Sequence, residues 1–191
     1  MTALHKTSPT LCPKPIAFGT YVSTPDVWFY LSEFVDMVDE APSSDEFAQT
    51  IAELHKHGVD PDGMFGWPHP VFSGTSAQIF PLSKSWEETF SRGIQQTFAL
   101  ETASQGHDDE LSRLETALVE KVIPRLLRPL QTEGRNIMPT LVHGDLWDGN
   151  VALDADTGDA IIFDPTAMYA HNECKLLTYL CYGFQTAIYC G

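Results

Sequence analysis

Short runs of β-branched and aromatic residues near the N-terminus predict two strands, over residues 16–21 and 28–34. The turn-forming residues 23–26 lie between these runs, so we expect an antiparallel hairpin. A second pair of apolar runs, 151–153 and 160–163, flanks a segment rich in Asp, Thr and Gly. This pattern predicts a second hairpin near the C-terminal end of the chain.

Apolar residues at helical spacing predict a helix over residues 45–57, between the two hairpins. Ser43 or Ser44 supplies a side-chain oxygen for the exposed N–H groups of the first turn, and Gly58 ends the helix. The N-terminal third of the chain therefore reads as a hairpin followed by one capped helix.

Two longer helices are predicted further along, over residues 86–104 and 109–130. The second should bend near Pro124, because proline lacks the N–H that a continuous helix needs. Gly and Pro are frequent in residues 58–82, which predicts a long loop. Strands and helices in this order indicate a mixed α+β fold.

Composition and charge exclude several classes of function. The chain has 191 residues, 43% of them hydrophobic, which is enough for a sizeable core. Its net charge is −15 with only 11 Lys and Arg, so we expect no nucleic acid as a partner. No apolar run approaches the roughly 20 residues that span a bilayer, so we expect no membrane partner.

The four cysteines, Cys12, Cys174, Cys181 and Cys190, have neither the C-x-x-C spacing of zinc sites nor the density of a disulfide scaffold. A reducing compartment suits such a chain, and we expect a cytoplasmic location.

The candidate chemistry lies in the segment HGDLWDGN, residues 143–150, and in IIFDP, residues 161–165. Asp145 precedes Asn150 by five residues, and Asp164 follows the second strand of the C-terminal hairpin. A hairpin brings its open ends together, so Asn150 and Asp164 should lie about one strand spacing, roughly 5 Å, apart. One cation could contact both side chains.

Oxygen ligands without thiolate or imidazole suit Mg²⁺, which takes further ligands from nucleotide phosphates. Asp145, in the loop that enters the hairpin, would then face the hydroxyl that receives the phosphoryl group and accept its proton. The acid, amide and acid spacing is therefore that of a kinase-type phosphoryl-transfer site, with Mg²⁺ bound to the phosphates of a nucleotide.

These motifs, together with YAHNE at residues 169–173, resemble the fructosamine kinase (ketosamine-3-kinase) family. FYLSEFV at residues 29–35 is similar to the strand and hinge of that family, and the resemblance covers about residues 1–175. It implies a protein-kinase-like, aminoglycoside-phosphotransferase-like fold. Residues 1–35 would be a remnant of the small lobe with the hinge, and residues 36–191 a large lobe shortened at its C-terminus.

The resemblance also implies an ATP-dependent kinase that phosphorylates the sugar 3-hydroxyl of ketosamines, which are ribulosamine or fructosamine adducts on protein amines. Glycated proteins or small ketosamines would be its partners, and loss of the unstable 3-phosphate would restore the amine.

Roles for individual residues follow from the same resemblance. The implied set comprises Asp145 as catalytic base, Asn150 and Asp164 as Mg²⁺ ligands, Trp147 and Glu173 at the substrate, His143 as a brace for the loop, and Glu33, Phe34 and Val35 at the adenine.

Other interpretations of the same residues remain open. Trp147 could equally be a core residue or an aromatic contact for the substrate, and Glu173 could be a structural residue. The Gly-rich phosphate loop and strand Lys of kinases have no counterpart in the chain, so a truncated, inactive remnant that binds a nucleotide or a protein is an alternative. His143 and Asp145 also form an H-x-D triplet, which with His171 would suit Fe(II) in an oxygenase.

Overall fold

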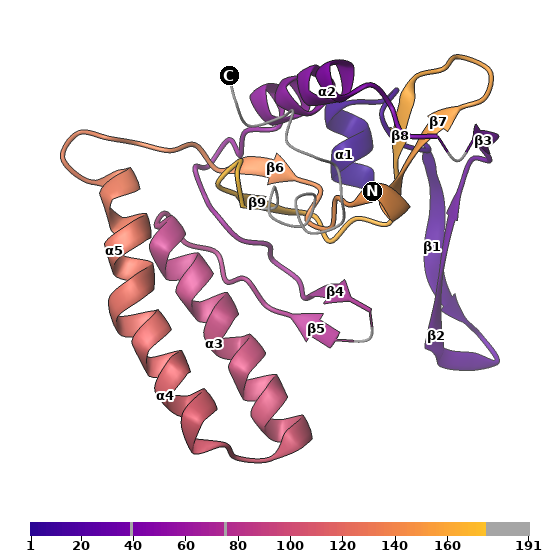
Figure 1. The fold of residues 1–191 in the computed structure, drawn as a ribbon. Coiled ribbons are helices and arrows are strands. Elements are labelled where there is room, and N and C mark those ends of the chain that lie inside the picture. The colour runs from indigo at the N-terminus through magenta and orange to yellow at the C-terminus, as the bar shows by residue number, and fades with distance from the viewer. Residues whose placement is uncertain (39, 75, 175–191) are drawn as a thin grey trace. The chain divides into compact units, whose positions relative to one another are not determined.

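The computed structural model of the protein describes residues 1–38, 40–74 and 76–174, which divide into two units. The first unit contains residues 1–58 and 143–167, and the second contains residues 59–142 and 168–174. Both units combine helices with short antiparallel sheets, which confirms the predicted α+β class. Figure 1 labels the elements of each unit.

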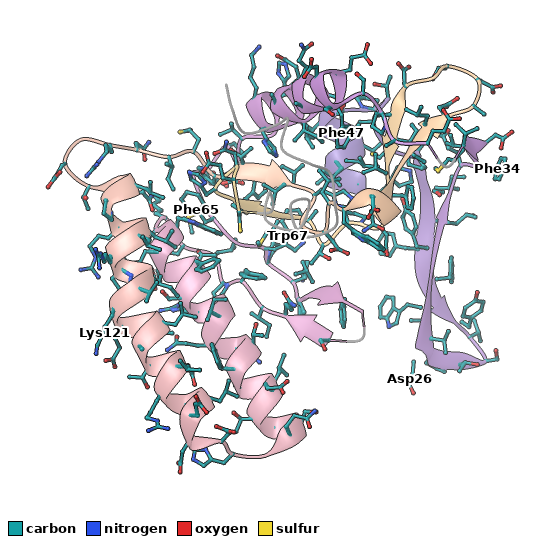
Figure 2. The ribbon with its side chains drawn as sticks, in the orientation of Figure 1. Asp26, Phe34, Phe47, Phe65, Trp67 and Lys121 are labelled. Atoms are coloured by element: carbon teal, nitrogen blue, oxygen red, sulfur yellow. The ribbon has the colours of Figure 1, made fainter. Side chains whose placement is uncertain are left out.

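The first unit begins with helix α1 (Thr2–Thr7) and the hairpin of β1 (Pro15–Tyr21) and β2 (Thr24–Ser32). The two strands pair antiparallel, as predicted. The predicted turn over residues 23–26 was wrong, because the strand already resumes at Thr24 and only two residues connect the strands. Asp26 lies near the turn end of this hairpin, and Phe34 lies beyond its other end (Figure 2).

Helix α2 (Ser44–His57) has the predicted caps. The Ser43 hydroxyl accepts a hydrogen bond from the Glu46 N–H at 3.4 Å and donates one to the Glu46 carboxylate at 2.6 Å. The helix ends at Gly58, whose N–H donates to the Leu54 carbonyl. Phe47 and Leu54 are buried, so the apolar face of the helix packs into the core of the first unit.

The predicted C-terminal hairpin is formed by β7 (Val151–Asp154) and β8 (Ala160–Ile162), with Val151 opposite Ile162. The short strand β3 (Met37–Val38) pairs with β7 and completes a three-stranded sheet in the order β3-β7-β8. At the open end of the hairpin, the Phe163 N–H donates to the Asn150 carbonyl at 3.1 Å. The backbone on either side of the hairpin is therefore held together just where the motif residues lie.

The second unit contains helix α3 (Trp86–Gln105) beside a segment that starts with α4 (Asp109–Ala117) (Figure 1). Helix α3 matches the prediction to within one residue. The helix predicted over residues 109–130 is divided, because a π-helical turn (Leu118–Val122) joins α4 to α5 (Ile123–Leu127). The turn ends two residues before Pro124, whose missing N–H prevents a continuous α-helix.

The expectation of a long loop over residues 58–82 was wrong in part, because it contains a small hairpin. Its strands are β4 (Val71–Ser73) and β5 (Ser76–Gln78), with Val71 opposite Gln78. Strands of three residues are too short for an alternating pattern to indicate pairing, although Val71 is buried and Phe72 is exposed.

Strands β6 (Thr140–Val142) and β9 (Met168–Ala170) pair antiparallel in the second unit, with Val142 opposite Met168. Both residues belong to the core of this unit, beside Phe65 and Trp86, whose ring centroids are 5.6 Å apart. The residues on either side of segment 143–167, Val142 and Met168, are therefore paired with each other, and the segment that carries the motifs is a connection between β6 and β9.

Candidate active site

His143, the first residue after β6, forms hydrogen bonds both within the motif loop, residues 143–150, and to a residue beyond it. Its side chain is 3% exposed. The Asp145 N–H donates to Nδ1 at 3.3 Å, so the proton lies on Nε2, which donates to the Phe163 carbonyl at 2.9 Å. A neutral imidazole thus links the loop before the hairpin to the residue after it.

Gly144 brings the same two segments into close backbone contact. It adopts a φ of +89°, a conformation that L-residues rarely take. A Cβ at this position would overlap the carbonyl oxygen and carbon of Thr166. The glycine of the HGD triplet is therefore required by both conformation and space.

The Asn150 side chain joins the three motif residues. It is buried, and its Nδ2 donates to the Asp145 carbonyl at 2.8 Å and to the Asp145 carboxylate at 3.2 Å. The same nitrogen lies 3.5 Å from the Asp164 carbonyl. The sequence pattern predicted that the side chains of Asn150 and Asp164 would lie together at the edge of the hairpin. The structure brings the Asn150 side chain to the backbone carbonyl of Asp164, and the approach of the two side chains stays a prediction.

Asp164 has a φ of +53°, in the left-handed region. Aspartate tolerates this conformation better than most residues, at a cost of about 1–3 kcal/mol that the surrounding structure must offset. Its carboxylate is exposed, whereas the neighbouring Ile162 is fully buried. The turn after β8 therefore directs an acidic side chain outward at the end of an apolar strand.

Trp147 is half-buried, and its ring lies against the backbone of Gly149. The short 3-10 turn Asp148–Asn150 produces this arrangement, since the Asn150 N–H donates back to the Trp147 carbonyl at 3.0 Å. Trp147 is therefore more exposed than the core residue Trp86, but it is not fully exposed to solvent.

The predicted hinge residues follow β2. Glu33 is fixed to Lys14, because its N–H donates to the Lys14 carbonyl at 3.0 Å and its carboxylate accepts the Lys14 N–H at 2.8 Å. Phe34 is 89% exposed, and Val35 is half-buried.

A cleft of about 650 Å³ in the first unit was not predicted from the sequence. Phe18 and Tyr30, which face each other across β1 and β2, line one part of it, and residues 163–165 line another. Burial, and secondarily the nearby Cys12 thiol, raises the pKa of the Tyr30 hydroxyl. The aromatic residues that alternate along the hairpin strands were the only indication of this cleft in the sequence. The pairing of Phe18 with Tyr30 and the position of Asp164 beside them could not be predicted from it.

Glu173 belongs to the second unit, so the contacts within the motif loop do not include it. Its side chain is exposed, and its N–H donates to His171 Nδ1 at 3.2 Å.

The iron alternative finds no support in this geometry, since both ring nitrogens of His143 already form hydrogen bonds. Within residues 1–38, 40–74 and 76–174, no three His, Cys, Asp or Glu side chains gather where they could bind one metal ion. Over the same residues, none of the helices has the length and apolar character that crossing a membrane requires.

Solved structures share this fold. A candidate fructosamine-3-kinase of Haemophilus somnus superposes with a TM-score of 0.69 at 21% identity, over 98% of this chain and 59% of that one. A candidate fructosamine-3-kinase of Thermobifida fusca gives a TM-score of 0.68 at 24% identity, over 95% and 57%. The fold is therefore the kinase-like fold that the motifs predicted.

The fructosamine kinase family model matches residues 1–191, and the chain belongs to this family. It is 28% identical to the chloroplastic protein-ribulosamine 3-kinase of Arabidopsis thaliana over 192 residues, which cover 99% of this chain and 55% of that protein. It is 30% identical to the ketosamine-3-kinase of Mus musculus over 213 residues, covering 99% and 65%. The chain thus spans between about half and two thirds of the length of these relatives.

Proposed function

We propose that the protein is an ATP-dependent kinase that phosphorylates the 3-hydroxyl of ketosamines, the ribulosamine or fructosamine adducts of protein amines. The observation that carries the proposal is the Asn150 side chain, whose amide nitrogen contacts both Asp145 and Asp164. Phosphoryl transfer requires a base for the acceptor hydroxyl and a cation for the phosphates, placed close enough to act on the same phosphoryl group. A buried amide that joins the two acidic residues supports such an arrangement.

In the proposed reaction, the Asp145 carboxylate orients the sugar hydroxyl and accepts its proton. The bond from the γ-phosphorus to its bridging oxygen breaks as the bond to the sugar oxygen forms, and ADP leaves. Asn150 positions the base, because its amide nitrogen donates to the Asp145 carbonyl and carboxylate.

Mg²⁺ fits the donor atoms of this loop. The Asn150 nitrogen is directed toward the loop, so the amide oxygen is the atom that would contact a cation, together with the exposed Asp164 carboxylate. When bound there, Mg²⁺ would neutralise charge on the phosphates, which the net charge of −15 makes necessary.

The cleft in the first unit is the site we propose for the adenine nucleotide. Its volume of about 650 Å³ suits a ligand of that size, and Asp164 lies in its wall. Phe18 and Tyr30 offer aromatic surfaces for the base. Ser32 lines the cleft, and the proposed hinge residues Glu33, Phe34 and Val35 follow it directly in the chain without lining the cleft themselves. The Glu33 N–H is already bonded to Lys14, so a hinge contact to adenine would use the Glu33 carbonyl and the backbone of Val35.

We further propose that Trp147 contacts the sugar-amine acceptor, with glycated proteins or small ketosamines as partners in the cytoplasm. The role of Glu173 at the substrate stays a prediction from the family resemblance. Elimination of inorganic phosphate followed by addition of water would then release the sugar as a dicarbonyl compound and restore the amine. The relatives named as ribulosamine and ketosamine kinases support this acceptor class.

Phosphate gain by a ribulosamine-modified lysine peptide, incubated with the chain and Mg-ATP and followed by mass spectrometry, tests the proposal. Asp145→Asn should abolish the gain. Asp156→Asn is the matched control, because it makes the same change at an exposed position of the β7–β8 turn. Nucleotide binding without any transfer by the parent chain would instead favour the binding-module alternative.

A further inference from the structure

The indole of Trp147 occupies the space that a side chain at Gly149 would need. A Cβ built on Gly149 would meet three atoms of the six-membered ring of the indole, Cη2, Cζ2 and Cζ3, the last two at 2.6 and 2.8 Å. Outside the adjacent residues 148 and 150, those three are the nearest atoms to that position, so the indole limits which side chain position 149 can carry.

The backbone beneath the ring is fixed on both sides. The Gly149 N–H donates to the Asp148 carboxylate at 3.1 Å, and the Asn150 N–H donates to the Trp147 carbonyl at 3.0 Å. Asn150 is in turn bonded to Asp145 through its side chain. The position of the indole is therefore defined relative to the same loop that presents the proposed catalytic base.

We propose that Gly149 is a positioning residue that seats the Trp147 indole as a fixed platform for the protonated amine and sugar of the ketosamine. This inference rests on the proposed function. An aromatic face attracts a cation and packs against apolar C–H groups, and a ketosamine has both in one small ligand. The acidic residues Asp145 and Asp148 in the same loop favour a cationic acceptor further.

Alanine at position 149 should displace the platform without unfolding the chain. The atoms that a Cβ would meet belong to the far end of a half-buried side chain, which can rotate away. The ring would then no longer lie over the loop, while the backbone contacts of Asn150 remain. We expect Gly149→Ala to raise KM for the ketosamine about tenfold, with KM for ATP unchanged and kcat within about threefold.

A double-mutant cycle with Trp147→Leu separates this role from a general structural one. In the Trp147→Leu background no indole is present at this position, so Gly149→Ala should have almost no further effect on KM. Gly158→Ala is the control, because an added Cβ there has no atom within 4 Å. An equally large effect of Gly149→Ala with and without the indole would overturn the proposal.

Spectroscopy tests the positioning without turnover. The chain has four tryptophans, so the Trp147 signal is taken as the difference between parent and Trp147→Phe in near-ultraviolet circular dichroism and emission. Gly149→Ala should change this difference signal. Titration with a ribulosamine-lysine should change the spectra of the parent chain and leave those of Trp147→Phe unchanged. If ribulosamine perturbs the signal but no phosphate is transferred, the platform stands and the kinase proposal fails. If transfer occurs and Gly149→Ala changes neither signal nor KM, the platform fails alone.

Discussion

Replacing Gly144 by alanine should damage the motif loop more than any other single-methyl change at a glycine of the hairpin region. Gly144 combines a φ of +89° with a backbone that touches the Thr166 carbonyl group. Thr166 is 3% exposed, and its Cα lies only 3.1 Å from where the new Cβ would be. Relief would require moving a buried backbone segment that is continuous with Asp164.

The cost has two parts that can be separated. An alanine in the left-handed region costs about 1–2 kcal/mol, and forcing an extra methyl group into a packed site costs about 1–3 kcal/mol more. Gly158→Ala isolates the first part, because Gly158 has a φ of +74° but open space around it. We therefore expect a loss of about 1 kcal/mol of unfolding free energy for Gly158→Ala and about 2–5 kcal/mol for Gly144→Ala.

Urea unfolding followed by tryptophan emission measures both losses, provided that the slope of free energy against urea is unchanged. Phosphate transfer to a ribulosamine peptide should survive Gly158→Ala and disappear with Gly144→Ala, because Asp145 is the next residue. Equal losses of stability in the two variants would refute the argument from close backbone approach.

Three further predictions concern buried or half-buried groups. His143→Leu leaves the Phe163 carbonyl and the Asp145 N–H without their partner, and should cost about 1–3 kcal/mol per group in urea unfolding. Burial lowers the pKa of His55 from 6.5 to about 4, so its contribution to stability is complete above pH 6.5 and is lost as pH falls toward 4. The loss amounts to about 3 kcal/mol, and His55→Gln should flatten the stability curve over that window. Burial raises the pKa of Cys12 to about 11, and the side chain is 2% exposed, so maleimide labelling at pH 8 should require unfolding.

The elements with strong local signals were predictable from the sequence. Helix α2 has a serine N-cap with a glutamate three residues later and a terminal glycine, and its bounds agree with the prediction to within one residue. The hairpin β7–β8 was equally accessible, because two apolar strands flank a turn-rich segment. The closed geometry of any hairpin then predicts that Asn150 lies beside Asp164.

The remaining features depend on contacts between residues far apart in the sequence. The pairing of β6 with β9 joins Val142 to Met168 across the whole motif segment, and neither three-residue strand has a pattern of its own. The contact of Gly144 with Thr166, and the cleft that Phe18 lines together with residues 163–165, likewise join residues that are separated along the chain. Local propensity has no information about such long-range packing.

The central claim is that Asp145 directs phosphate to the 3-hydroxyl of a ketosamine. Phosphorus and proton NMR of a ribulosamine-lysine incubated with the chain and Mg-ATP would locate the phosphate directly. The account predicts a signal from phosphate on the 3-oxygen, followed by inorganic phosphate and free lysine amine, and neither with Asp145→Asn. Phosphate on another hydroxyl, or transfer that persists in Asp145→Asn, would contradict it.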